Sequence, residues 1–144
     1  MPVQLDEKDM KIIEILMSNA RSSYSEIAKV LGVSDVAIIK RVRKLEQQGI
    51  IKKYTILVDP KKLGYEAVSI TGVDVNPEYL FKTVSILKEK DYVKYLALTS
   101  GDHQIIATIW AKTRDELAQI LDEISKMPGV KRVCPAVILD VVKE

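Results

Sequence analysis

The segment over residues 23–48 most constrains the fold, because it contains two helix starts separated by one glycine. Residues 23–26 (Ser-Tyr-Ser-Glu) have the pattern of a capping box, which satisfies free backbone N–H groups in the first helical turn. Gly32 supplies the turn, since glycine adopts left-handed backbone angles without strain. Ser34 then caps a further helix that ends near Gly49. Two helices joined by a short glycine turn predict a helix-turn-helix motif.

In such a motif the second helix enters the major groove of DNA with its N-terminal residues at the base edges. Val36 and Ile39 lie on the predicted outer face, where an apolar side chain suits contact with a thymine methyl group. The basic residues of the same face are directed at phosphate. Arg41 has two readings, because it either contacts phosphate or braces the helix against an acidic neighbour. The predicted DNA-binding residues are Ser34, Asp35, Val36, Ile39, Lys40, Arg41, Arg43 and Lys44.

Charge is divided unequally along the chain. Residues 1–64 carry 12 Lys and Arg against 8 Asp and Glu, whereas residues 65–144 carry 10 against 12. Residues 40–53 contain six basic residues and one acidic residue. Such asymmetry is typical of a domain that docks on an anionic polymer, although a charge run by itself is more often a solvated helix face.

The first half also contains an earlier helix and a linking segment. Asp6 is predicted to cap a helix that precedes the motif, because its carboxylate can accept from free first-turn N–H groups. Residues 50–58 alternate between apolar and polar, which predicts a strand that either pairs with a second subunit or forms a short wing. The segment that follows is turn-rich. The predicted organisation is a helix-turn-helix domain with its linking strand over 1–58, a hinge over 59–66 and a second domain over 67–144.

The second domain repeats a strand–helix–strand pattern twice. Strands are predicted over 67–75, 92–99, 104–111 and 130–142, with one helix inside each half. This βαββαβ order with right-handed crossovers predicts a ferredoxin-like sheet with both helices on one face. The fold class is therefore α+β. Pro135 cannot donate to a β ladder, so the last strand is predicted at a sheet edge.

The second face of that sheet carries apolar residues that nothing in the chain is expected to cover. A large exposed apolar sheet face predicts self-association. We therefore expect at least a dimer, in which two recognition helices bind half-sites of a pseudo-palindrome in double-stranded DNA.

Composition excludes several classes of protein. No apolar run reaches the roughly 18 residues that span a bilayer, and the first residues lack the regions of a signal peptide, so the cytoplasm is the expected compartment and no membrane partner is expected. Cys134 and His103 are the only cysteine and the only histidine. We therefore expect no intrachain disulfide, Cys-based zinc site, multi-His metal site or catalytic triad. No catalytic residue, metal ion or cofactor is predicted, and nothing pairs a nucleophile with a base.

Short motifs spread over nearly the whole chain also occur in a characteristic order. They are Asp6…Asp9…Ile12-Ile13, residues 24–28, 31–34, 41–46, 49–54, Pro60…Leu63-Gly64, 100–103 and 128–130. Together they resemble the Lrp/AsnC (feast/famine) transcription regulators. The resemblance implies a βαββαβ ligand-sensing domain, dimers formed through the sheets, frequent octamers, and amino acids bound at the contact between dimers. The Ile-, Lys- and Glu-rich composition further suggests an archaeal source.

The resemblance also implies an effector site in the second domain. Its residues are Leu98, Thr99, Ser100, Gly101, Asp102, His103, Gln104, Asp122, Val133, Cys134, Pro135 and Ala136. Gly101 lets the backbone approach a ligand, backbone N–H groups can hold an α-carboxylate, and Asp102 can pair with an α-ammonium group. The other interpretation is that Gly101 and Asp102 simply form a hairpin turn.

Asp122 bears on the choice of effector. A carboxylate that faces an apolar pocket is costly when it has no partner, which favours a lysine or arginine effector. The alternative is that Asp122 is merely a solvated surface residue. The expected function is an amino-acid-responsive, sequence-specific DNA-binding regulator. A competing hypothesis is an amino-acid-sensing module that regulates an enzyme without binding DNA.

Overall fold

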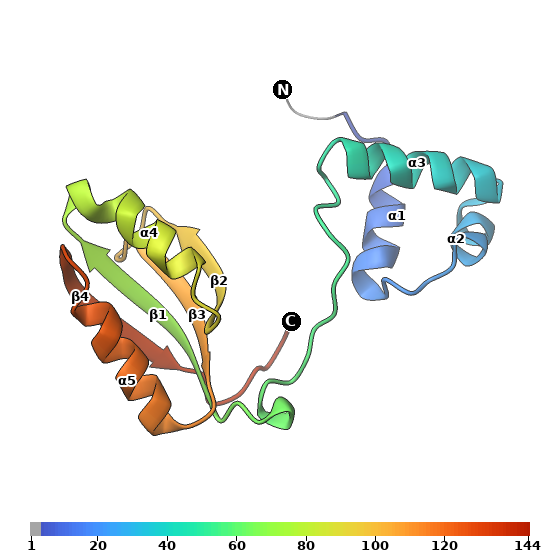
Figure 1. Cartoon of the computed structure of the whole chain (residues 1–144). Helices are drawn as coiled ribbons and strands as arrows, with labels where there is room; N and C mark the ends of the chain where they lie inside the picture. The colour runs from blue at the N-terminus through green and yellow to red at the C-terminus, as the bar shows by residue number, and fades with distance from the viewer. Residues whose placement is uncertain (1–3) are drawn as a thin grey trace. The chain divides into compact units, whose positions relative to one another are not determined.

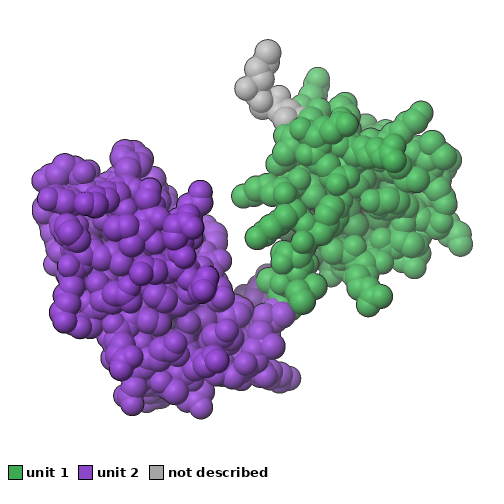
Figure 2. Space-filling view, in the orientation of Figure 1, with its two compact units in different colours: residues 1–57 green, residues 58–144 purple. Residues whose placement is uncertain are grey.

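The computed structural model describes residues 4–144 and separates them into two compact units (Figures 1 and 2). The division falls between Leu57 and Val58, next to the hinge expected over residues 59–66. Each unit has its own hydrophobic core. No helix among residues 4–144 is both long enough and apolar enough to cross a membrane.

Unit 1 consists of three helices, each of which begins at a side-chain cap. They are α1 (Glu7–Ser18), α2 (Tyr24–Leu31) and α3 (Asp35–Gln47). The Ser23 and Ser34 hydroxyls each accept a backbone N–H of the first turn at 3.1 Å. Gly32 ends α2 at φ 67° and ψ 37°, the left-handed conformation that the turn requires. The helix–turn–helix predicted from the caps and the glycine is therefore present.

The core of unit 1 fixes the rotation of α3 about its axis. Ile38, Val42 and Leu45 are at most 1% exposed and pack with Ile12 of α1 and Ile27 of α2. Burying side chains of this size stabilises the folded state by about 1.5–3 kcal/mol each. Because this stripe must face inward, the opposite face of α3 stays at the surface.

Residues 50–58 form no strand within one chain, so the short wing predicted there is absent, and pairing with a second subunit stays a prediction. The described backbone forms no strand between α3 and the 3₁₀ turn η1 (Lys61–Leu63). A strand needs a neighbour for its backbone hydrogen bonds, and alternation of apolar residues alone fixes only an extended path. Ile56 and Leu57 are instead 79% and 73% exposed in this linker.

Unit 2 is a four-stranded antiparallel sheet with two helices on one face (Figure 1). Its strand order is β2-β3-β1-β4, so β4 is an edge strand, as Pro135 predicts. The ferredoxin-like α+β fold is confirmed, although the last strand ends earlier than expected. The elements are β1 (Ala67–Val75), η2 (Pro77–Tyr79), α4 (Leu80–Lys88), β2 (Val93–Leu98), β3 (Ile105–Ala111), α5 (Arg114–Ser125) and β4 (Val130–Val137).

The two faces of the sheet differ in chemistry. Alternate residues of β1 and β3, such as Val73 and Ile109, are buried with Leu87 of α4 and Ile124 of α5. The other face, which we call the open face, is formed by the residues between them. Directly paired residues point to the same face, so the pairs of β1 and β4 extend it. The open face includes Val68, Ile70, Gly72, Asp74, Ile106, Thr108, Trp110, Arg132, Cys134 and Ala136.

Candidate nucleic-acid interface and effector site

The outer face of α3 is cationic and accessible. Lys40, Arg43 and Lys44 are exposed, and Val36 is 60% exposed beside them. Among the described residues, none of these three basic side chains forms an ion pair. Their charge is therefore available to an external anion such as a DNA phosphate. Ile39, expected to be exposed, is half-buried, so it presents less apolar surface than Val36.

The first residues of α3 have structural partners. The Ser34 hydroxyl caps the helix by accepting from the Ala37 N–H at 3.1 Å. The Asp35 carboxylate accepts from the Ser25 hydroxyl at 2.5 Å, which ties the start of α3 to α2. These contacts fix the N-terminal end of α3 within unit 1.

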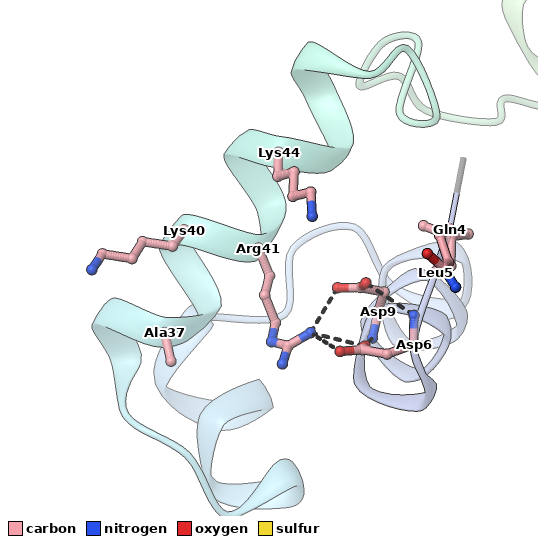
Figure 3. A pocket seen from close by; sticks show the side chains of 8 residues that line it. All are labelled: Gln4, Leu5, Asp6, Asp9, Ala37, Lys40, Arg41 and Lys44. Atoms are coloured by element: carbon pink, nitrogen blue, oxygen red, sulfur yellow. Dashed lines mark hydrogen bonds and ion pairs between the residues drawn. The ribbon is translucent and has the colours of Figure 1, made fainter. Parts of the chain in front are cut away.

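Arg41 binds two carboxylates at the start of α1 (Figure 3). Its Nη1 atom lies 2.7 Å from Asp6 Oδ2 and 2.9 Å from Asp9 Oδ1. Asp6 and Asp9 also form the capping box of α1, with each side chain accepting the other's backbone N–H. Of the two roles predicted for Arg41, the structure favours the brace between helices over a free phosphate contact.

This ion pair changes the acid–base behaviour of both partners. The side-chain hydrogen bond from Arg41, helped by the backbone N–H of Asp9, lowers the pKa of Asp6 to about 2. The hydrogen bonds to Asp6 and Asp9 raise the pKa of Arg41 in return. Both groups are therefore charged at any physiological pH.

A groove of about 670 Å³ runs beside this brace (Figure 3). Three basic side chains of α3 form one wall, and residues at the start of α1 form the other. Its lining residues are Gln4, Leu5, Asp6, Asp9, Ala37, Lys40, Arg41 and Lys44. Because Arg41 is neutralised by its partners, Lys40 and Lys44 supply the positive charge at this surface.

The β2–β3 connection carries half of the residues expected to bind an effector. Its ends are joined by the Thr99 N–H, which donates to the Gln104 carbonyl at 2.9 Å, and the Thr99 hydroxyl donates to the His103 carbonyl. Residues 98–102 are exposed. Gly101 has no left-handed backbone angle, and a Cβ added to it would meet nothing within 4 Å. The space beside Gly101 is therefore open, as a ligand site requires. Neither the backbone angles nor the packing of this chain requires a glycine at that position.

The last two residues of the connection turn back onto β1. Gln104 Oε1 accepts the Val75 N–H at 2.7 Å, so its side chain is used in the fold. His103 Nδ1 lies 3.1 Å from Asp74 Oδ1, and Arg132 Nε donates to Asp74 Oδ2 at 3.2 Å. Burial is the largest influence on Asp74 and raises its pKa, but His103 and Arg132 together outweigh burial and lower it.

Asp74 is absent from the residues predicted to form the site. Its signal in the sequence is weak, because it is a single acidic residue in a strand of mostly apolar and small residues. Only the pairing of β1 with β3 and the path of the β2–β3 connection bring it to His103.

The remaining predicted effector residues do not form one pocket within a single chain. Asp122 lies on α5, on the helix-covered side of the sheet, and its carboxylate is paired with Lys126 at 2.8 Å. Val133 packs on the core of unit 2, whereas Cys134 lies on the open face opposite Gly72. Pro135 and Ala136 are exposed on the edge strand. The structure thus brings His103 and Cys134 to one face but leaves Asp122 on the other side.

Known proteins match both units. The model of the AsnC-type helix-turn-helix domain matches residues 5–46, and that of the Lrp/AsnC ligand binding domain matches residues 68–144. The HTH-type transcriptional regulator LrpA of Pyrococcus abyssi is 52% identical over 140 residues, which cover 96% of this chain and 99% of that protein. The match to the AsnC-type helix-turn-helix domain favours DNA binding over a sensing module that does not contact DNA.

Solved structures agree over nearly the full length. The structure of Escherichia coli AsnC is 30% identical, with a TM-score of 0.87 over 99% of this chain and 97% of that chain. The Neisseria meningitidis transcriptional regulator NMB0573, crystallised as an L-Met complex, shares the fold at 19% identity, with a TM-score of 0.87 over 98% and 94% of the two chains. The chain therefore belongs to the Lrp/AsnC family, in its archaeal branch, and is a DNA-binding transcription regulator rather than an enzyme.

Proposed function

We propose that this protein regulates transcription by binding a pseudo-palindromic operator in double-stranded DNA as a dimer or a multiple of dimers. The observation that carries the proposal is the unpaired cationic face of α3, held outward by the buried stripe of Ile38, Val42 and Leu45. One recognition helix covers few base pairs, so two copies on half-sites about one DNA turn apart provide the specificity.

The open face supports assembly. Ile70 is 45% exposed in the middle of a sheet strand, and the same face carries Ile106 and Trp110. A contiguous apolar surface of this kind is typical of a protein–protein contact. The exposed Ile56 and Leu57 give the linker apolar side chains that a second chain would cover, and pairing there would supply the strand partner that one chain lacks. Dimers that associate further would form the octamer expected of the family.

DNA binding is tested with the upstream region of the protein's own gene. Fluorescence anisotropy of a labelled duplex, with an unrelated duplex as competitor, separates specific from non-specific affinity. Light scattering on the same sample gives the number of chains per complex. Specific binding by a dimer or larger assembly supports the proposal. Equal affinity for both duplexes, or a monomer at micromolar concentration, contradicts it.

The effector we propose is an amino acid bound at the β2–β3 connection. The match to a ligand binding domain and the L-Met complex of the Neisseria regulator support this class. The connection offers backbone donors for a carboxylate and the exposed Asp102 for an ammonium group. Calorimetric titration with the twenty amino acids tests it, since saturable binding of at least one is expected.

A preference for lysine or arginine requires Asp122 of a neighbouring copy, because Asp122 of the same chain lies on the other side of the sheet, and the ligand must replace Lys126 there. Both side chains of that pair are largely exposed, at 60% for Asp122 and 74% for Lys126, so the exchange costs little. Asp122→Ala should therefore weaken lysine binding, while Glu123→Ala, which breaks the neighbouring pair with Lys90, should not. Unchanged lysine affinity in Asp122→Ala, or stronger binding of a branched apolar amino acid, assigns Asp122 to the solvated surface instead.

A further inference from the structure

Three side chains of metal-ligating type meet on the open face of unit 2. Asp74 of β1, His103 of the β2–β3 connection and Cys134 of β4 each offer one ligand atom, and these atoms lie within 4.8 Å of one another. His103 and Cys134 are the only histidine and the only cysteine of the chain. The two residue types with the strongest affinity for transition metals are thus brought together from positions 31 residues apart in the sequence.

The backbone of the sheet builds the place where these groups meet. Gly72 is paired with Cys134 across the β1–β4 ladder, and Asp74 is paired with Arg132. The His103 ring lies directly over Gly72, since a Cβ added there would be 2.3 Å from the ring. Any larger residue at position 72 would displace the imidazole, so the glycine makes room for it beside Asp74 and Cys134.

We propose that Asp74, His103 and Cys134 form a binding site for a divalent transition-metal ion of the Zn²⁺ type. Zinc accepts carboxylate oxygen, imidazole nitrogen and thiolate sulfur in one tetrahedral site, at bond lengths that place the ligand atoms about 3.3–3.8 Å apart. His103 Nδ1 and Asp74 Oδ1 are already 3.1 Å apart. The thiolate closes the remaining gap by a side-chain movement of about 1 Å, and water takes the fourth position.

The surroundings of the cluster suit a bound cation. Asp74 Oδ1 faces His103, while Asp74 Oδ2 accepts from Arg132 Nε at 3.2 Å. Both carboxylate oxygens lie within 3.3 Å of His103 Nδ1, so metal binding replaces this hydrogen bond, while Arg132 orients the carboxylate through Oδ2, as outer-shell partners commonly do. Asp74 and a Cys134 thiolate together neutralise a divalent ion.

Binding has a simple proton balance. The Cys134 thiol loses its proton to solvent as its sulfur bonds the metal, and His103 binds through one ring nitrogen while its single proton stays on the other. One proton is therefore released per metal ion. No metal ion is predicted from the sequence, because sites built from several cysteines or several histidines are excluded, so a site with one residue of each and a carboxylate departs from that prediction.

The test is titration of the metal-free, full-length protein with Co²⁺ and then Zn²⁺, without amino acid or DNA. We expect one Co²⁺ per chain, a thiolate-to-cobalt charge-transfer band, visible bands of tetrahedral intensity, and displacement by Zn²⁺ with these bands lost. Because no effector is added, failure here leaves the proposed regulation by amino acids untouched. Absence of saturable binding, or binding without the thiolate band, overturns the metal site.

Variants separate this site from weak surface binding. Cys134→Ser, His103→Gln and Asp74→Asn should each reduce Zn²⁺ affinity by more than about 100-fold, beyond the loss caused by an outer-shell change. Asp91→Asn removes an exposed acid of unit 2 outside the cluster and should bind Zn²⁺ as the wild type does. Circular dichroism of the metal-free variants checks folding, and Zn²⁺ should raise Tm in the wild type and in Asp91→Asn only. Unchanged affinity in Cys134→Ser overturns the proposal even if another variant does not fold.

Discussion

The outer face of α3 and the open face of unit 2 both present groups for external partners, but they are built over different distances along the chain. The α3 surface depends on caps, a glycine turn and a buried stripe that all lie within 26 residues of one another. The cluster on the open face joins residues 74, 103 and 134, and depends on strand register. Local patterns therefore determine the first surface, whereas the second exists only after the sheet has formed.

The largest effect should separate the two faces of α3. Ile38→Ala removes a fully buried side chain and should lower the free energy of unfolding by about 2–5 kcal/mol. Val36→Ala, two residues away on the exposed face, should change stability by less than about 0.5 kcal/mol. Urea denaturation measures both. A similar loss in the two variants would mean that α3 is rotated differently from the structure described.

DNA binding should show the opposite pattern. Replacing Arg43 and Lys44 together by alanine should weaken every duplex by more than about tenfold at low salt, because each lost phosphate contact reduces the salt slope by about 0.9. Val36→Ala should instead change preference among sequences, by about 1–3 kcal/mol at the affected base pair. Anisotropy titrations at several salt concentrations measure both quantities. An unchanged salt slope in the double variant would remove these two residues from the interface.

Substitution of two glycines compares a local constraint, the backbone angle at Gly32, with a long-range one, the contact of Gly72 with His103. Gly72→Ala places a methyl group against the His103 ring and should cost about 1–3 kcal/mol by overpacking. Gly32→Ala meets no neighbour but forces alanine to φ 67°, at a cost of about 1 kcal/mol. Thermal unfolding of both variants shows which substitution lowers stability more. Only Gly72→Ala should also shift the His103 ring resonances in an NMR spectrum. Unchanged His103 resonances in Gly72→Ala would contradict the placement of the ring over Gly72.

The features that the sequence could predict are the local ones, and those that it could not predict depend on strand register. The ends of α2 and α3, the edge position of β4 and the two-layer α+β fold all follow from caps, glycine, proline and periodicity. Residues 50–58 form no strand within one chain, because alternation of apolar residues predicts an extended path but does not supply a pairing partner. The meeting of Asp74 with His103 and Cys134 could not be read from spacing, since no local pattern encodes which strands are neighbours.

The smallest effect concerns the brace between α1 and α3, which links a local cap to a residue 35 positions away. Asp6 has its pKa lowered from 3.8 to about 2, so its pairing with Arg41 stabilises the fold above pH 3.8. As the pH falls from 3.8 towards 2, the folded state must give up this charge and the stabilisation is lost. Asp6→Asn should therefore flatten the dependence of stability on pH within that window.

The matched control is Glu7→Gln, which removes one first-turn carboxylate that has no contact with Arg41. Glu7→Gln should lose stability between pH 3.8 and 2 as the wild type does. Arg41→Ala should reproduce the flattening seen in Asp6→Asn, because either change removes the same ion pair. Urea denaturation at closely spaced pH values between 2 and 5 measures all three variants. If Glu7→Gln flattened the curve as much as Asp6→Asn, general first-turn charge rather than the Arg41 brace would hold α1 against α3.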